Sequence, residues 1–447
     1  MVWLAGAVAL LVIIGLVLTA TLANSGDESA SEQTSAQRPQ NPFEEARTQG
    51  VADALSTYTA ALRAGDAPAA AAVLDPSATD ALRAQTASSA AGLGDLPLTT
   101  FEYRLGDTTA AEQLVPADLQ ARLDAQGSSD SWVAPVQLRY AYQGIDTTPA
   151  VVDVPMVMAR YGDGWKIVAD AGPVLGGAAP SGQVWQFADP GARPVPTAGG
   201  ESLVLANGAS PLTGTVAEQL PAAIDSVTGF WGTRWPQTAG IIVTPGDDEF
   251  ASITGASADD ADAAAAVTVF TTIDPNGPTA LGQRVVFTPQ AAQLDRNTLA
   301  VVLRHELFHV ASRTATSEGA PIWVTEGVAE YVGRRGTYTR LAQAAPALAD
   351  EIAAAGPPAD LPTDANFAPS SPDAQLAYQS AWSVAAFIAD TFGDDKLKNF
   401  YVALAGADQP TDPALVAASQ DTASKVVLGI SRDDLVRQWR AWLSRQD

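Results

Sequence analysis

The chain has 447 residues, of which 47% are hydrophobic and only 17% charged. This length predicts more than one globular domain, and the hydrophobic content excludes global disorder. The formal net charge of -25 argues against a nucleic-acid partner, because an acidic surface repels phosphates. The absence of cysteine excludes disulfides and thiolate metal sites, and there are just two histidines.

The first 23 residues predict a transmembrane anchor. Residues 2–22 carry no charge, and at about 1.5 Å per residue a helix of this length crosses the hydrocarbon of a bilayer. A cleaved signal peptide is the alternative, with a passable cleavage site at 21–23, although such peptides have a shorter apolar core and a basic start. An uncleaved anchor predicts a single-pass protein of the cell membrane with an extracytoplasmic globular part. A cleaved signal peptide predicts a secreted protein.

Residues 24–41 are rich in Ser, Gln and Glu and predict a flexible tether. Residues 42–173 predict an α+β domain in which helices come first and strands follow. The expected strands are 98–105, 132–142, 151–161 and 165–169, and Asp163-Gly164 is a hairpin signal between the last two.

This order of elements resembles the cone-shaped α+β domains of the nuclear-transport-factor-like superfamily. Two short segments add to the resemblance, LRAGD at 62–66 and GWKI at 164–167. The resemblance implies helices packed on a curved antiparallel sheet, in domains that serve as enzymes, binders or spacers. Because this domain has no histidine and no clustered carboxylates, we interpret it as a spacer or interaction module.

Residues 174–200 are rich in Gly, Pro and Ala and predict an interdomain linker. The second domain, 201–447, is expected to combine a small sheet with a helical half. Its expected elements are strands at 202–206, 240–244, 266–271 and 283–288, a helix at 216–230, and helices throughout from Thr298.

Both histidines lie in the segment His305-Glu306-Leu307-Phe308-His309. Residues 297–312 predict a helix, in which side chains four residues apart project from one face, so both imidazoles can bind the same metal. Glu306 lies beside the metal rather than on it, where it can act as a base on a bound water. This pattern is typical of zinc metallopeptidases and predicts one catalytic zinc.

A catalytic zinc needs a third protein ligand and one open position. Since the chain has no cysteine and no third histidine, that ligand must be a carboxylate. Glu326 and Glu330 stand four residues apart in an apolar segment that Pro321 can start as a helix. We predict Glu326 as the third ligand. Glu330 is predicted to accept a hydrogen bond from a ligating histidine, with a surface role as the alternative.

These residues resemble the gluzincin peptidases, in the membrane-anchored or secreted bacterial branch related to the zinc aminopeptidases. The carrying motifs are HExxH at 305–309 and WxxEGxAE at 323–330, with YQSAWSV at 378–384 similar to the family's tyrosine-bearing helix. The resemblance covers about residues 201–447. It implies a thermolysin-like two-lobed domain, hydrolysis of peptide or protein substrates, and stabilisation of the tetrahedral intermediate by Tyr378. From the residues alone, Tyr378 could equally be a packing aromatic.

One strand departs from the family pattern. Aminopeptidases of this clan carry a Gly-x-Met-Glu-Asn strand whose Glu binds the free amine, whereas residues 282–288 read GQRVVFT. This favours endopeptidase action or an unfamiliar substrate, and the strand could still pair with an extended peptide at its edge. Two other hypotheses stay open: a non-enzymatic envelope binding module with a structural zinc, and a peptidase inhibited by its own first domain. The retained Glu306 argues against the former, because a structural zinc needs no base.

Overall fold

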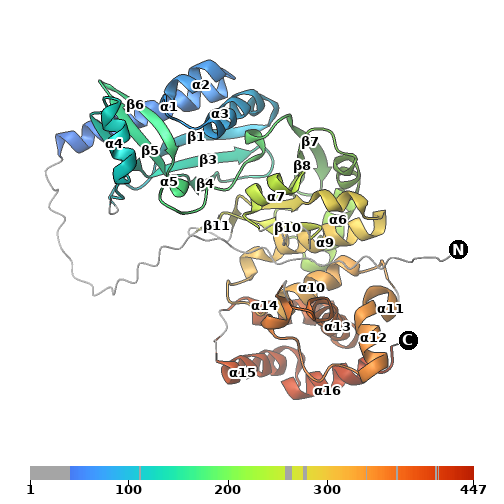
Figure 1. Ribbon diagram of the computed structural model, residues 1–447. Coiled ribbons are helices and arrows are strands. Elements are labelled where there is room, and N and C mark those ends of the chain that lie inside the picture. The colour runs from blue at the N-terminus through green and yellow to red at the C-terminus, as the bar shows by residue number, and fades with distance from the viewer. Residues whose placement is uncertain are drawn as a thin grey trace. The chain divides into compact units, whose positions relative to one another are not determined.

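The computed structural model describes residues 41–109, 112–256, 264–274, 279–338, 340–368, 371–407, 410 and 412–446 (Figure 1). They fall into two compact units, one ending at Ala192 and the other beginning at Arg193. Both units combine helices with sheets, so the protein is α+β.

The predicted transmembrane helix is corrected by the structure. Residues 1–23 lie outside the described ranges, and none of the helices within those ranges is long and apolar enough to cross a membrane. No described helix therefore supports the predicted membrane anchor or the predicted localisation in the cell membrane. The predicted tether also lies outside the described residues, apart from Asn41, the N-cap of the first helix.

The first unit begins with helices and continues with short strands. Its elements are α1 (Pro42–Arg63), α2 (Ala67–Val73), α3 (Asp80–Gly92), η1 (Leu93–Asp95), β1 (Leu98–Leu105), α4 (Ala117–Ala125), β2 (Asp130–Ala134), β3 (Val136–Tyr142), β4 (Ala150–Asp153), β5 (Met156–Tyr161), β6 (Gly164–Asp170), α5 (Ala171–Val174) and η2 (Val184–Gln186). The strands form two antiparallel sheets, in the orders β1-β3-β4 and β2-β5-β6.

Two of the predicted strands are each split at a proline. The run 132–142 becomes β2 and β3 around Pro135, and the run 151–161 becomes β4 and β5 around Pro155. Proline has no N–H to donate, so it interrupts a hydrogen-bonded ladder. After each break the chain enters the other sheet, and the single curved sheet expected from the sequence is two three-stranded sheets. The resemblance to the cone-shaped family stays a prediction.

The segment predicted as a linker, 174–200, is partly packed. Trp185 is fully buried in the first unit, with its ring edge-on to Phe101 and Tyr140 at centroid distances of 5.5 and 5.2 Å. Strand β7 (Pro190–Thr197) forms the outermost strand of the second unit's sheet. Tertiary contacts therefore order a stretch whose composition predicts a loop.

The second unit places a five-stranded sheet before a set of helices (Figure 1). After β7 come β8 (Gly200–Asn207), α6 (Pro211–Trp231), β9 (Gly240–Val243), α7 (Asp247–Thr254), β10 (Ala266–Val269), β11 (Thr272–Ile273), β12 (Ala280–Leu281), β13 (Arg284–Phe287) and η3 (Pro289–Gln293). The helical part contains α9 (Arg296–Ser312), η4 (Arg313–Ala315), α10 (Ile322–Arg334), α11 (Leu341–Ala344), α12 (Pro346–Ala355), η5 (Asp364–Phe367), α13 (Ala374–Phe392), α14 (Asp394–Ala405), α15 (Pro413–Ala423), η6 (Ser424–Leu428) and α16 (Arg432–Leu443).

The five strands lie in the order β10-β13-β9-β8-β7. β9 is parallel to both of its neighbours, and its residues are buried throughout, as are those of β13. Because β13 is paired on both sides, it cannot bind a peptide at its edge, and that expectation from the sequence is wrong. Among the described strands, the antiparallel β10 lies at this edge of the sheet instead.

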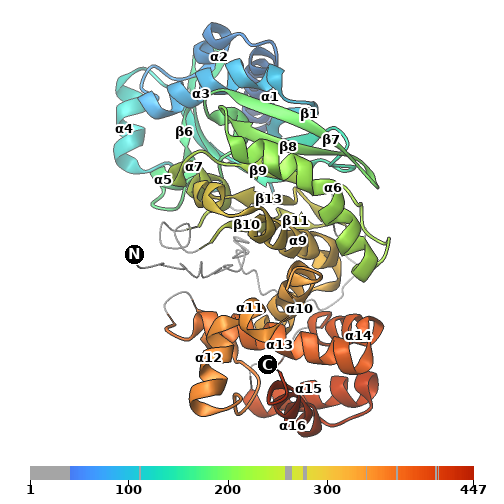
Figure 2. The same cartoon turned by 90° about the vertical axis from the view of Figure 1, so that its right-hand side faces the viewer.

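Helices α6 and α9 pack against each other and against the sheet (Figure 2). Leu220 and Ile224 of α6, Leu303 and Leu307 of α9 and Ile241 of β9 are fully buried in one apolar core. Helix α10 packs on α9 and on α13. Helix α9 therefore lies between the sheet and α10.

Candidate metal centre

Helix α9 carries both histidines. It begins at a side-chain cap, since Asp295 Oδ1 accepts hydrogen bonds from the backbone N–H groups of Asn297 and Thr298 at 2.9 and 3.1 Å. The helix continues through His305 and His309, one turn apart. Its start and end lie within one residue of the prediction from the sequence.

Two glycines allow α10 to lie close to its neighbours. A Cβ atom at Gly333 would lie 2.8 Å from the carbonyl oxygen of Val301 and 3.3 Å from Cβ of His305. A Cβ atom at Gly327 would lie 2.5 Å from the carbonyl oxygen of Ala381 on α13. The missing side chains let α10 approach α9, which places Glu326 opposite the two histidines.

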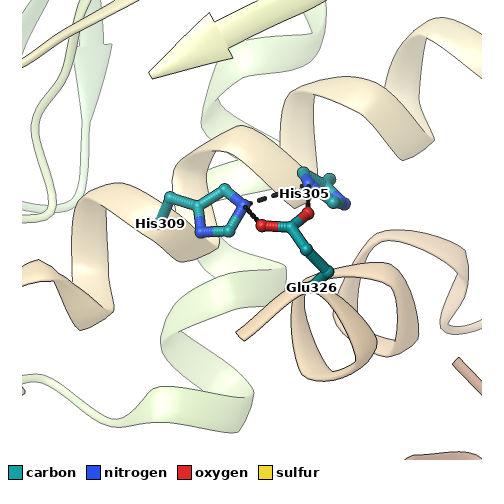
Figure 3. Close-up of side chains that lie close together, drawn as sticks. All are labelled: His305, His309 and Glu326. Atoms are coloured by element: carbon teal, nitrogen blue, oxygen red, sulfur yellow. Dashed lines mark hydrogen bonds and ion pairs between the residues drawn. The ribbon is translucent and has the colours of Figure 1, made fainter. Parts of the chain in front are cut away.

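The side chains of His305, His309 and Glu326 point toward one another (Figure 3). The two Nε2 atoms lie 3.0 Å apart. His305 Nε2 lies 3.3 Å from Oε2 of Glu326, and His309 Nε2 lies 3.5 Å from Oε1. The structure therefore brings together the three residues predicted as metal ligands.

This group fits a zinc ion. Zinc takes nitrogen and oxygen ligands at about 2.0–2.2 Å, and tetrahedral coordination then separates two ligand atoms by roughly 3.4 Å. The two Nε2 atoms are 3.0 Å apart, and the separations from Glu326 are 3.3 Å at Oε2 and 3.5 Å at Oε1, all close to that value. Oε2 of Glu326 is buried and makes no hydrogen bond within the described part of the chain, as expected of a ligand atom. His305, His309 and Glu326 are the residues that would hold the metal.

Burial differs among the three predicted ligands. His305 is fully buried and the side chain of Glu326 is 4% exposed, whereas that of His309 is 22% exposed. Solvent therefore reaches the group from the side of His309. Burial by itself would raise the pKa of Glu326, but His309 and His305 lower it to about 2, so its carboxylate is ionised. Burial would lower the pKa of His309, and the carboxylate of Glu326 outweighs this and raises it.

Glu306 follows His305 in the sequence and is 1% exposed. Its Oε2 accepts a hydrogen bond of 2.7 Å from the hydroxyl of Thr268 on β10. Its Oε1 is buried and has no hydrogen-bond partner among the described residues. Leaving a buried carboxylate oxygen without a partner costs free energy of folding, so this oxygen is a candidate proton acceptor.

Glu330 lies behind the group and is fully buried. Its Oε1 is 3.8 Å from Nδ1 of His305, the ring nitrogen that faces away from Glu326, and this distance is too long for the hydrogen bond predicted from the sequence. Its Oε2 forms an ion pair with Arg334, whose Nε donates a hydrogen bond to the carbonyl oxygen of Ala344 at 3.1 Å. The structure thus places Glu330 in the interior rather than on the surface, next to His305.

Tyr378 lies on α13 and is 2% exposed, and its ring is edge-on to Phe367 at 5.0 Å. It precedes Ala381 by three residues, and Ala381 lies against Gly327 of α10. Residues three apart share a helix face, so Tyr378 is on the face of α13 that turns toward α10. Its role in catalysis stays a prediction.

Two residues of this region were missed by the sequence analysis. Arg334 follows Glu330 by four residues on a helix, a spacing that predicts an ion pair, so a signal was present. Thr268 is separated from Glu306 by 38 residues and gives no signal in the sequence. Its contact exists because β10 packs against α9.

Comparison with known proteins adds little. No protein family and no curated protein matches this sequence. Similar solved structures are M1 zinc metallopeptidases. One is the enzyme from Deinococcus radiodurans, with 14% identity over 70% of this chain and a TM-score of 0.34. Another is a mutant of that enzyme bound to a Tyr-Ser-Ala substrate, with 14% identity over 70% of this chain and a TM-score of 0.35.

A third similar structure, a two-domain M1 zinc metallopeptidase mutant bound to L-arginine, has 13% identity over 63% of this chain and a TM-score of 0.34. The matched parts span 60%, 61% and 58% of the length of these three proteins. At such low TM-scores and identities the likeness carries no argument about the activity of this chain. The activity proposed below rests instead on the geometry of the group around His305.

Proposed function

We propose that this protein is a zinc-dependent peptidase that hydrolyses peptide bonds in a peptide or protein substrate. The observation that carries the proposal is the arrangement of His305, His309 and Glu326 within ligand distance of one another, next to Glu306. Three protein ligands leave one position of a tetrahedral zinc open, which is the arrangement of catalytic rather than structural zinc sites.

The chemistry follows from what each side chain can do. A zinc ion in this place would polarise a substrate carbonyl and acidify water. Glu306 accepts a proton from the attacking water at Oε1 and passes it to the leaving amine. The hydroxyl of Tyr378 donates a hydrogen bond that stabilises the oxyanion. Glu330 orients His305 from the side away from the metal.

The alternative is a binding module in which zinc only joins helices. A structural site has no use for a buried carboxylate beside its ligands, and burying one without full hydrogen bonding is destabilising. Glu306 is such a carboxylate, with Oε1 lacking a partner among the described residues. Exposure of His309 also favours an open site. Both observations support the enzyme over the module.

The substitution Glu306→Gln tests the proposal, because it removes the base and keeps the size of the side chain. Cleavage of a library of internally quenched fluorogenic peptides should fall by about 10²–10⁴-fold. Bound zinc, measured by elemental analysis, should not change, since all three proposed ligands remain. Glu201→Gln, at an exposed glutamate at the start of the second unit, is the matched control and should change neither.

Two results would contradict the proposal. Undiminished cleavage by Glu306→Gln would exclude Glu306 as the base. A wild-type protein that holds zinc and cleaves no peptide of the library would favour the structural-zinc module.

A further inference from the structure

We propose that Thr268 is a positioning residue for Glu306: its hydroxyl holds one carboxylate oxygen so that the other is left to accept the proton. This inference rests on the proposed peptidase function and names a residue that the sequence did not indicate. Among the described residues, the side-chain hydroxyl of Thr268 makes its hydrogen bonds to Glu306 and to none of the proposed metal ligands, so it acts through Glu306.

Thr268 makes two contacts with the same residue. Its Oγ1 lies 2.7 Å from Oε2 of Glu306 and 3.1 Å from the backbone carbonyl oxygen of Glu306. A hydroxyl has a single proton to donate, and the carboxylate oxygen is the closer of the two acceptors. The hydrogen bond therefore goes mainly to Oε2 of Glu306.

This hydrogen bond restricts rotation of the carboxylate. The terminal torsion of a glutamate is broad, so without a partner the group would sample many orientations. Within the described part of the chain, Thr268 is the one hydrogen-bond donor to either side-chain oxygen of Glu306. Its hydroxyl holds Oε2, which leaves Oε1 with a fixed direction. A base held in one orientation avoids the loss of rate that a misplaced group causes.

Thr268 is itself held by regular structure. It lies in β10, paired with Val285 of the fully buried β13, and β10 packs on α9. Groups placed by strands and helices are positioned more accurately than groups on loops. The donor and the base thus come from two elements that the same core holds together.

A purely structural role for Thr268, joining β10 to α9, predicts a different set of effects. Loss of a structural tie lowers stability and disturbs zinc and substrate binding together. Loss of a positioning contact lowers kcat while KM and zinc content stay the same. The two roles can therefore be separated by measuring these quantities in the full-length zinc-loaded protein.

The experiment compares Thr268→Val, which keeps the shape and removes the hydroxyl, with Thr268→Ser, which keeps the hydroxyl. On a peptide that the wild type cleaves, kcat of Thr268→Val should fall roughly 10–100-fold, the usual cost of losing such a supporting contact. KM and bound zinc should stay unchanged, and Thr268→Ser should regain most of the rate. Thr422→Val, at an exposed helix position whose hydroxyl bonds only to its own helix, is the matched control.

A double substitution sharpens the test. In the Glu306→Gln background no base remains to be positioned, so adding Thr268→Val should not lower the residual rate further. An equal loss in both backgrounds, or an unchanged kcat in Thr268→Val alone, would overturn the inference.

Crystal structures of the metal-free proteins test the inference without any activity. The carboxylate of Glu306 should have one orientation in the wild type and in Thr268→Ser, and several in Thr268→Val. A single unchanged orientation in Thr268→Val would overturn the inference even if the wild type proved to be no peptidase. A wild type without peptidase activity, together with several orientations in Thr268→Val, would instead refute the proposed function and leave the positioning contact standing.

Discussion

The two units differ in how many ionisable side chains they bury. In the first unit, Asp75 is the one charged residue that is buried among those the structure describes, and polar contacts such as Tyr58 with Thr86 pair neutral groups. In the second unit, the helices α9 and α10 bury a set of ionisable side chains side by side. They are His305, Glu306, Glu326, Glu330 and Arg334.

This difference indicates where the chemistry lies. Burying a charge costs several kcal/mol unless it is paired or bound to a metal, so a protein concentrates buried charge where function requires it. Among its described residues, the first unit meets this cost only at Asp75, and it fits a spacer or interaction module. Helices α9 and α10 bury several charged side chains despite this cost. Several of the buried polar atoms, including Oε1 of Glu306, lack hydrogen-bond partners in the described structure. A bound metal would compensate part of this cost.

The largest effect is expected from removing a metal ligand. His309→Ala should abolish stoichiometric zinc, because two ligands cannot form a three-ligand site. His309 is the most exposed of the three, so this variant disturbs the core least, and elemental analysis measures the result. His305→Ala should behave the same. Full zinc occupancy in either variant would show that the buried ionisable side chains of the second unit do not form this three-ligand metal site.

Tyr378→Phe should have the next largest effect. It removes one donor to the oxyanion and should lower kcat about 10²–10³-fold with zinc retained. Tyr331→Phe is the matched control, since the hydroxyl of Tyr331 bonds to Asp394 on a different helix, and its kcat should not change. Equal rates for Tyr378→Phe and wild type would make Tyr378 a packing residue.

Glu330→Gln should weaken zinc binding by roughly 10–100-fold, because it removes the charge that orients His305 from behind. Competition with a chelator of known affinity measures the change. Glu201→Gln should bind zinc like the wild type. If Glu330→Gln does so too, the ion pair with Arg334 serves stability alone.

The smallest effect is expected in the first unit. Thr86→Val removes the 2.9 Å hydrogen bond between Tyr58 and Thr86 and should lower the free energy of unfolding by about 0.5–1.5 kcal/mol. Urea denaturation measures this change, and zinc content and peptide cleavage should be unaffected. Altered zinc binding in this variant would show that the first unit contributes to the metal centre.

The sequence predicted most elements of the second unit because their signals are local. Each signal is contained in a single element, as in the apolar runs of β9 and β13 and the periodic pattern of α9. The first unit was predicted less well, since the expected strands ran through the prolines at 135 and 155, and no local pattern showed which sheet each half would join. Sheet membership depends on pairing between segments distant in sequence, which no local pattern records.

The sequence by itself was enough to predict the ligand types of the metal site. With two histidines one turn apart and no cysteine, helix geometry and the coordination needs of zinc leave only a carboxylate as third ligand. Only the tertiary structure decided which groups surround that set. Thr268 reaches Glu306 because β10 is the strand that packs on α9, and Glu330 is interior because Gly333 lets α10 lie close to α9. Such contacts follow from packing between elements that are distant in sequence. Spacing along a helix shows only which residues of that helix share a face.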